Sequence, residues 1–254
     1  MRAWFAGALA ALSLGACAGA VLTGESITAG SDHIMAAIAD PRRPEADRAR
    51  DDIRHPAEIL AFAQIFPGQR VADIGPGGGY YTRLFSVAVG DQGRVYAIDR
   101  PNAAPDRPRA ILAVAPEYPN VTVMQQGYQG WSAPEPLDAV FVSQIYHDWF
   151  YTALSLDLPA LNRAIFDALK PGGVYVIIDH AAPAGHTINT ASPQEDIHRI
   201  DQAQVIREVT AAGFVLDGES EILRNPEDNR TLRVFEGDIR GRTDQFVLRF
   251  RKPA

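Results

Sequence analysis

The amino-acid sequence predicts an α/β fold, built as a doubly wound sheet of about seven mostly parallel strands. Three observations support this prediction. Short apolar runs alternate with amphipathic helical segments along the chain. Some runs, such as 140–142 and 175–178, are apolar throughout, as strands covered by helices on both faces should be. A glycine-rich turn also follows the apolar run at 71–74, and open α/β sheets bind ligands at such turns.

Composition and charge narrow the class of protein. The chain has 254 residues, of which 46% are hydrophobic and 22% charged, as expected for one large globular domain. The net charge of −7 and the lack of a basic stripe predict no nucleic-acid partner. A group of arginines alternates with Asp and Glu, which predicts a solvated surface of mixed charge. These arginines are Arg42, Arg43, Arg48, Arg50 and Arg54.

The first residues have the features of an export signal. Arg2 precedes an apolar run over 3–14, which has the length of a signal-peptide core. The run ends in Leu14-Gly15-Ala16-Cys17, which resembles a bacterial lipobox whose cysteine is diacylated. We therefore expect a lipoprotein signal peptide over 1–16, a tether with a short helix over 17–44, and one folded domain over 45–254. An ordinary signal peptide with a chance cysteine is the alternative.

In the first half of the chain, apolar spacing and proline and glycine positions predict where helices begin and end. Apolar spacing predicts a short helix over 32–39. Pro56 suits the first turn of a helix over 56–66, which Pro67-Gly68 ends. The glycine turn leads into a helix over 80–89. The predicted strands of this half are 71–74, 94–98 and 121–124, with a short helix over 109–115 between the last two.

Turn and capping residues define the second half. An apolar stripe predicts a helix over 154–169, and Lys170-Pro171-Gly172-Gly173 predicts a tight turn after it. Asp201 and Gln204 have the spacing of an N-cap residue and its partner, which predicts a helix over 201–212. The predicted strands of this half are 138–143, 174–178, 214–223 and 245–250.

The glycine turn after the first strand is the best candidate for a binding site. Glycines without a Cβ let backbone N–H groups approach a ligand closely. The dinucleotide-binding pattern would place a third glycine where Tyr80 stands, so this pattern does not fit. An acidic residue followed by three alternating glycines fits instead, from Asp73 through Gly75 to Gly79. Asp99 ends the next strand, 24 residues after Gly75. In dinucleotide-binding folds, an acidic residue about 20 residues after the glycine turn binds the ribose hydroxyls.

These motifs resemble motifs I and II of the class I S-adenosylmethionine-dependent methyltransferases. Leu169-Lys170-Pro171-Gly172-Gly173 and Ala211-Ala212-Gly213-Phe214 resemble the segments that precede strands five and six in these enzymes. The runs 56–66, 75–85 and 243–246 are similar to a subgroup of predicted bacterial methyltransferases with secretion signals. The resemblance covers about residues 45–252, and thus the predicted folded domain.

The resemblance implies a Rossmann-like sheet whose last strand is antiparallel, and S-adenosylmethionine as cofactor. In this family the acid at the position of Asp73 contacts the methionine amino group. An acid that often contacts adenine is replaced here by Gln125-Gln126-Gly127, which leaves Gln126 as the candidate for that contact. The residues implied to bind the cofactor are Asp73, Gly75, Gly77, Gly79, Asp99 and Gln126.

The acceptor side is expected where strands four and five end. Tyr146-His147-Asp148 follows strand four, and Asp179-His180 ends strand five, so both lie at the same edge as the glycine turn. A histidine held by an aspartate suits removal of a proton from the acceptor. We therefore expect His147, Asp148 and His180 to be catalytic or to bind the acceptor. Hydrogen-bonded structural roles are the alternative.

A divalent metal ion is a second interpretation of the same segments. His147, Asp148, His180 and His198 offer nitrogen and oxygen ligands. These histidines lack the i, i+4 spacing of a local metal motif, so we do not favour this interpretation.

The predicted function is methyl transfer from S-adenosylmethionine to an unidentified small acceptor, by an enzyme tethered to the outer membrane through Cys17. The donor is not expected in quantity outside the cytoplasm, so two alternatives stay open. The first alternative is a non-catalytic lipoprotein that binds a nucleoside-like ligand. The second is a divergent metal-assisted hydrolase.

Overall fold

The computed structural model of the chain describes residues 32–101, 106 and 108–254. Cys17, the predicted signal peptide and most of the predicted tether lie outside these residues. None of the described helices combines the length and apolarity needed to cross a membrane.

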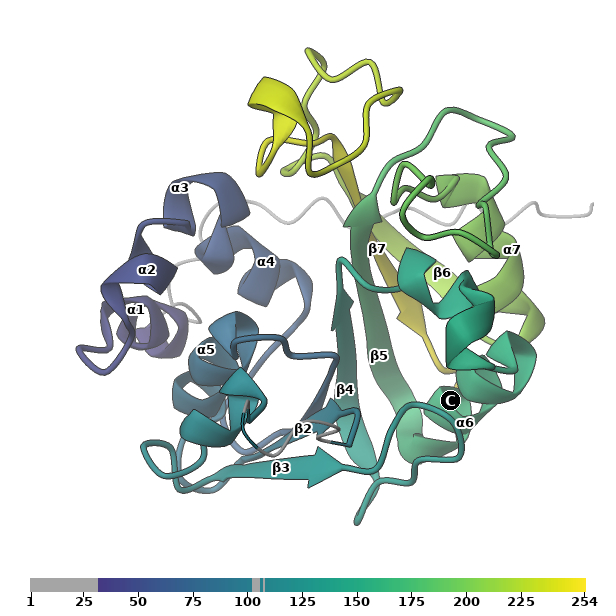
Figure 1. Cartoon of the computed structure of the whole chain (residues 1–254). Coiled ribbons are helices and arrows are strands. Elements are labelled where there is room, and N and C mark those ends of the chain that lie inside the picture. The colour runs from purple at the N-terminus through teal and green to yellow at the C-terminus, as the bar shows by residue number, and fades with distance from the viewer. Residues whose placement is uncertain (1–31, 102–105, 107) are drawn as a thin grey trace, which may run out of the picture. The chain divides into compact units, whose positions relative to one another are not determined.

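A seven-stranded sheet lies at the centre, in the order β3-β2-β1-β4-β5-β7-β6 (Figure 1). Strands β1 to β5 are parallel, and β7 runs antiparallel to both β5 and β6. The predicted fold class and the antiparallel last strand are therefore confirmed. The strands are β1 (Arg70–Ile74), β2 (Arg94–Asp99), β3 (Val121–Gln125), β4 (Leu137–Ser143), β5 (Leu169–His180), β6 (Val215–Ser220) and β7 (Gln245–Arg251).

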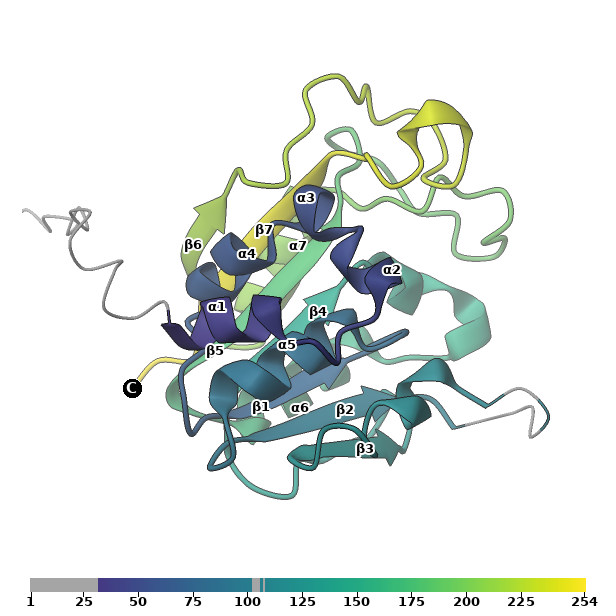
Figure 2. The same ribbon diagram turned by 90° about the vertical axis from the view of Figure 1, so that its left-hand side faces the viewer.

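Helices cover both faces of the sheet because successive strand residues point to opposite sides. Val71 packs in one apolar core, with α1, α4 and α5, while its neighbour Ala72 packs in the other, with α6 and α7. Figure 2 shows the first group in front of the sheet. The helices are α1 (Asp32–Ala39), α2 (Glu45–Arg48), α3 (Asp51–Arg54), α4 (Pro56–Phe62), α5 (Tyr80–Val89), α6 (Leu158–Ala168) and α7 (Gln202–Ala211). Short 3-10 helices are Ala110–Ala113, His147–Phe150, Thr152–Leu154 and Gly237–Ile239.

The order in which strands are added to the sheet changes direction at β1, and this defines the ligand-binding edge. Strands β2 and β3 lie on one side of β1, and β4 and β5 lie on the other. The connections that leave β1 and β4 therefore separate at the carboxyl edge, where open α/β sheets bind ligands.

The helix predicted over 154–169 is shorter than the apolar stripe suggests. Ser155 has a left-handed backbone with φ of 50°, which separates the 3-10 turn at Thr152–Leu154 from α6. Asp157 caps α6 by accepting from the Ala160 N–H at 3.0 Å. Strand β5 begins at Leu169 and takes in the predicted turn over 170–173.

Helix α1 belongs to the same compact unit as the sheet. This unit extends from Ser31 to Ala254. Ile34 and Ala37 are buried in the core that also contains residues of α5. The packed domain therefore extends further toward the N-terminus than residue 45.

The arginine cluster is only in part the solvated surface that the charge alternation predicts. Arg43 is only 1% exposed and donates two hydrogen bonds, of 2.6 and 2.9 Å, to the Asp51 carboxylate. The Tyr80 hydroxyl donates to the same carboxylate at 2.7 Å. The guanidinium carbons of Arg50 and Arg54 lie 4.9 and 4.8 Å from the centre of the Tyr80 ring. The prediction is therefore wrong for Arg43, which is buried against Asp51, while Arg42 and Arg48 are exposed as predicted.

Candidate active site

The glycine turn has the conformation that its sequence suggests. Gly75, Gly77 and Gly79 have φ angles of 70°, 58° and 83°, a region that L side chains rarely adopt. A Cβ on Gly75 would overlap the Ile145 side chain and lie 3.2 Å from the Tyr128 hydroxyl. The turn therefore needs a glycine at position 75 both for its backbone angle and for the close approach of its neighbours.

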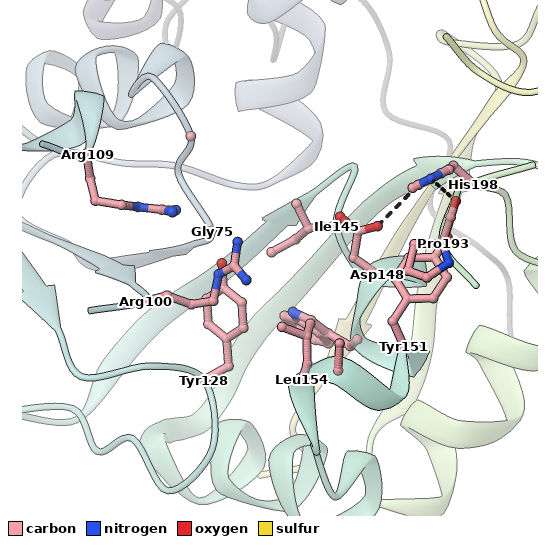
Figure 3. Close-up of a pocket in the computed structure, with 13 residues that line it drawn as sticks. Gly75, Arg100, Arg109, Tyr128, Ile145, Asp148, Tyr151, Leu154, Pro193 and His198 are labelled. Carbon is pink, nitrogen blue, oxygen red and sulfur yellow. Dashed lines mark hydrogen bonds and ion pairs between the residues drawn. The ribbon is translucent and has the colours of Figure 1, made fainter. Parts of the chain in front are cut away.

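Two pockets meet at this turn. The first, of about 280 Å³, lies beside α3 and α5. The second, of about 340 Å³, lies toward the segment after β4 (Figure 3). Gly75, Gly77 and Ile145 line both. The first pocket is also lined by Arg50, Arg54, Asp73, Pro76, Gly78, Tyr80, Tyr81, Ser143 and Gln144. The second is also lined by Arg100, Arg109, Tyr128, Asp148, Trp149, Tyr151, Ala153, Leu154, Pro193 and His198.

Asp73 contributes a buried carboxyl group to the first pocket. It lies in β1 and accepts a hydrogen bond of 2.5 Å from the Thr82 hydroxyl. Burial raises the pKa of Asp73 to about 7, because the ionised form loses its hydration. The nearby Asp99 carboxylate also raises the pKa of Asp73, while the Thr82 hydrogen bond and the Arg54 charge lower it. Asp73 therefore titrates much closer to neutral pH than an ordinary aspartate does.

Asp99 ends β2 and is fully buried. Its carboxylate accepts from the Arg100 backbone N–H at 2.8 Å and from the guanidinium of Arg109 at both oxygens. Arg109 is therefore hydrogen-bonded to both oxygens of the carboxylate that the sequence predicts to bind the ribose. Gln126 donates to the Ser132 carbonyl at 3.3 Å and is not among the described residues that line either pocket.

His147 begins the 3-10 turn after β4 and is held from two sides. Its Nδ1 lies 2.7 Å from Asp179 Oδ1, and its backbone N–H donates to Asp179 Oδ2 at 2.8 Å. Its Nε2 lies 3.1 Å from Asp148 Oδ1. Burial lowers the pKa of His147, but the charges and hydrogen bonds of Asp179 and Asp148 outweigh it and raise the pKa to about 10. The pKa of Asp148 is correspondingly held below its usual range by His147 and His198, against its own burial.

His198 reaches the same carboxylate from a distant segment. Its Nδ1 lies 3.4 Å from Asp148 Oδ1, and its Nε2 lies 2.8 Å from the Pro193 carbonyl oxygen. Its backbone is left-handed, with φ of 55°. The structure thus brings His198 beside His147 and Asp148, which lie in a separate segment of the sequence.

His180 lies apart from this group. Its Nδ1 is 2.7 Å from the Thr243 hydroxyl oxygen, and burial lowers its pKa to about 3. Its ring centre lies 5.8 Å from that of His147, and it is not among the described residues that line the two pockets. The structure therefore supplies a hydrogen-bonded position for His180 behind the pocket, and its catalytic role stays a prediction.

Several pocket residues escaped the sequence analysis. Arg100 and Arg109 follow β2 in a proline-rich segment without a regular pattern. Trp149 and Tyr151 lie in the turns that follow His147. No sequence motif marks these four residues, although their position just after strand ends at the carboxyl edge is a usable signal.

Solved structures of methyltransferases share this fold. A SAM-dependent methyltransferase from Aquifex aeolicus superposes with a TM-score of 0.57 at 20% identity, covering 85% of this chain and 96% of that one. At this identity the likeness establishes the fold alone.

Protein-L-isoaspartate O-methyltransferases are similar in sequence over part of their length. Protein-L-isoaspartate O-methyltransferase 1 of Arabidopsis thaliana is 33% identical over 124 residues, which are 46% of this chain and 49% of the relative. The enzyme of Ignicoccus hospitalis is 32% identical over 122 residues, or 48% of this chain and 52% of the relative. The chain thus spans about half the length of the curated relatives it matches.

The family match covers the site itself. Residues 51–215, well over half of the chain, match the model of the family described as protein-L-isoaspartate(D-aspartate) O-methyltransferase. This region contains the glycine turn, Asp99, His147 and His198. The chain therefore belongs to the protein-L-isoaspartate(D-aspartate) O-methyltransferase family.

Proposed function

We propose that this chain transfers a methyl group from S-adenosylmethionine to a carboxylate oxygen of an isoaspartyl residue in a protein. The observation that carries the proposal is the family match over residues 51–215. The predicted methyltransferase family and its cofactor agree with this match. The small-molecule acceptor predicted from the sequence lacks support from these relatives, whose names specify protein isoaspartate. The non-catalytic and hydrolytic alternatives also lack support.

The residues of the two pockets fit this donor. The first pocket offers the guanidinium groups of Arg50 and Arg54 for the methionine carboxylate, and Asp73 for its ammonium group. At the second pocket, Asp99 would hold the ribose hydroxyls once Arg109 has left it. Gly75 and Gly77 line both pockets, so a ligand that spans the two pockets would pass along the glycine turn.

A carboxylate acceptor changes what the chain must do. The donor supplies an electrophilic methyl group, which the acceptor oxygen takes while the C–S bonding electrons pass to sulfur. An ionised carboxylate has no proton to lose, so the reaction needs alignment and exclusion of water rather than a general base. His147 is buried, and its two ring nitrogens already lie against Asp179 and Asp148. Its proposed role is therefore to fix the position of Asp148, which lines the second pocket.

A labelled-methyl assay tests the proposal. The full chain is incubated with radiolabelled donor and a peptide that contains isoaspartate, and base-labile methyl ester is counted. The control peptide contains aspartate at the same position. We expect ester only on the isoaspartyl peptide, and its loss in Asp99→Ala. Equal labelling of both peptides, or none, contradicts the proposed acceptor.

We also propose that the chain is exported and anchored to a membrane through Cys17, so that its folded domain lies outside the cytoplasm. The lipobox-like segment Leu14-Gly15-Ala16-Cys17 supports this proposal. Fractionation of cells that express the full chain should place it in the membrane, and Cys17→Ser should release it. Unchanged membrane association of Cys17→Ser contradicts the lipid anchor.

A further inference from the structure

We propose that His147 Nε2, the Asp148 carboxylate and His198 Nδ1 form a binding site for one divalent metal ion. These ligand atoms all lie within 4.8 Å of one another. They come from the turn after β4 and from the segment before α7, which the fold brings together at the carboxyl edge of the sheet. The proposal concerns the site itself and does not depend on which acceptor is methylated.

The distances suit an ion between the three side chains. Asp148 Oδ1 lies 3.1 Å from His147 Nε2 and 3.4 Å from His198 Nδ1. Neighbouring ligands bound about 2.0–2.2 Å from one ion are separated from each other by about 2.8–3.6 Å in octahedral or tetrahedral geometry. Two of the three separations therefore already suit coordination of one ion, and the two histidine nitrogens lie within 4.8 Å of each other.

In the proposed metal-bound form, each imidazole turns one nitrogen lone pair toward the ion. The Nδ1–H of His147 donates to Asp179, which leaves Nε2 as the ligand atom. Asp179 also accepts the His147 backbone N–H, so the ring and its main chain are fixed by one carboxylate. Metal-bound histidines are commonly oriented by a carboxylate in this way.

The second imidazole is oriented by a backbone carbonyl. The Nε2–H of His198 donates to the Pro193 oxygen at 2.8 Å, which leaves Nδ1 facing Asp148. Arg233 Nη2 lies 3.4 Å from both His198 Nε2 and the Pro193 oxygen. A guanidinium only donates hydrogen bonds, so Arg233 and His198 Nε2–H both donate to the Pro193 carbonyl oxygen. Arg233 therefore does not change the tautomer of His198, in which Nδ1 carries the lone pair.

Access and charge favour an ion with open coordination positions. Figure 3 shows Asp148 and His198 together at one end of the second pocket, and the side chain of Asp148 is 39% exposed. With neutral imidazoles, Asp148 and Asp179 leave two negative charges near the site, which a divalent cation offsets. Two imidazoles and one carboxylate suit zinc, manganese, iron(II) or cobalt(II).

The role of the ion in methyl transfer, unlike the metal site itself, rests on the proposed function. Asp148 lines the same pocket as Gly75, where the donor would bind. An ion there would bind an acceptor oxygen and orient it toward the donor's methyl group. A proton on His147 that links Asp148 to Asp179 is the competing arrangement of the same groups, and the experiment must separate the two.

Metal titration of the full chain separates them. The protein is purified without nickel affinity, stripped with a chelator, and titrated with Co²⁺ and Zn²⁺ in the absence of donor. We expect one equivalent of Co²⁺ to give a visible absorption band that Zn²⁺ abolishes. Elemental analysis before stripping should show close to one equivalent of a transition metal.

Matched variants locate the ion. His198→Asn and His55→Asn both replace a histidine at positive φ, with angles of 55° and 44°, by a residue that tolerates this conformation. We expect His198→Asn to weaken Co²⁺ binding by about a hundredfold or more, and His55→Asn to leave it unchanged. Asp148→Asn should weaken binding similarly, with circular dichroism confirming the fold of each variant.

The outcomes are distinct for the two proposals. Absence of a saturable cobalt band, or equal binding in His198→Asn and wild type, overturns the metal site and leaves the proton arrangement. Because binding is measured without donor or acceptor, a failed methylation assay does not affect this result. Metal binding without any isoaspartyl methylation would overturn the proposed acceptor alone.

Discussion

Arg109 donates to both carboxylate oxygens of Asp99, a fully buried side chain at the end of β2. The hydrogen bond to Asp99 raises the pKa of Arg109 in turn. The predicted ribose partner is therefore already engaged, and a nucleoside ligand has to displace this guanidinium. Arg109 itself is 29% exposed, so it has room to leave.

Replacing this arginine should strengthen donor binding. In Arg109→Ala the Asp99 carboxylate is free, and the cost of breaking the ion pair disappears. That cost is about 1 kcal/mol for a pair with one partly exposed member, so affinity for S-adenosylhomocysteine should rise about threefold to tenfold by calorimetry. Asp99→Ala is the opposite control and should weaken binding. Weaker binding in Arg109→Ala would show that the guanidinium contacts the ligand directly.

Donor affinity should depend on pH through Asp73. Its pKa of about 7 reflects burial first, with Asp99 raising it and Thr82 and Arg54 lowering it. A ligand ammonium group favours the ionised carboxylate, so protonation at lower pH opposes binding. Affinity should therefore increase roughly tenfold between about pH 5.5 and about pH 7. Asp73→Asn should remove this increase, and a retained slope in that variant assigns the titration to another group.

The two first glycines of the turn should differ in their tolerance of alanine. Both have positive φ, which costs a non-glycine residue about 1 kcal/mol. Only at Gly75 would the new Cβ meet another side chain, whereas nothing lies within 4 Å of a Cβ at Gly77. Gly75→Ala should thus lower the free energy of unfolding by a further ~1–3 kcal/mol in urea denaturation. Adding Ile145→Ala should recover part of the difference; equal losses at both glycines contradict the contact.

A buried ion pair should control the segment that carries His198. Arg199 and Asp228 side chains are 0% and 1% exposed, with Arg199 Nη1 2.7 Å from Asp228 Oδ2. Arg199 also donates to the carbonyl oxygens of Ala181 and Leu232, which ties three segments together. Arg199→Met should lower the free energy of unfolding by about 3–5 kcal/mol, because it leaves a buried carboxylate unpaired. Denaturation within wild-type error contradicts this role.

The same pair should give the fold an acid-sensitive component. Burial raises the pKa of Asp228, but the Asp244 backbone N–H and Arg199 outweigh it and hold the pKa below its usual range. Since the folded-state pKa is depressed, the stabilisation is present above about pH 4 and is lost as the pH falls through the folded value. The stability difference between wild type and Asp228→Asn should shrink below about pH 4. A constant difference would assign acid sensitivity to other carboxyl groups.

Local patterns in the sequence predicted the glycine turn and the position of Asp99 at a strand end. The turn from Asp73 to Gly79 and the strand end at Asp99 depend on neighbouring residues and on strand alternation, which periodicity reveals. Their positions at one sheet edge then follow from the parallel topology. The ion pair between Arg109 and Asp99 could not be predicted in this way. Arg109 lies in an irregular segment, and its contact with Asp99 depends on tertiary packing.

The acceptor side required contacts between distant segments. His198 reaches Asp148 because the chain after β5 returns along Ala181, which forms an isolated bridge with Ile200. No sequence spacing encodes that return. The burial of Arg43 was missed for a related reason, since charge alternation predicts exposure unless a neighbouring helix covers the charges.

Calorimetric titration of S-adenosylhomocysteine into the full chain and into Asp99→Ala tests the central claim, a donor site at the glycine turn, most directly. We predict one site in the wild type with Kd between about 1 µM and about 100 µM, and at least a tenfold loss in Asp99→Ala. No binding heat up to about 1 mM ligand, or unchanged affinity in Asp99→Ala, would contradict the account.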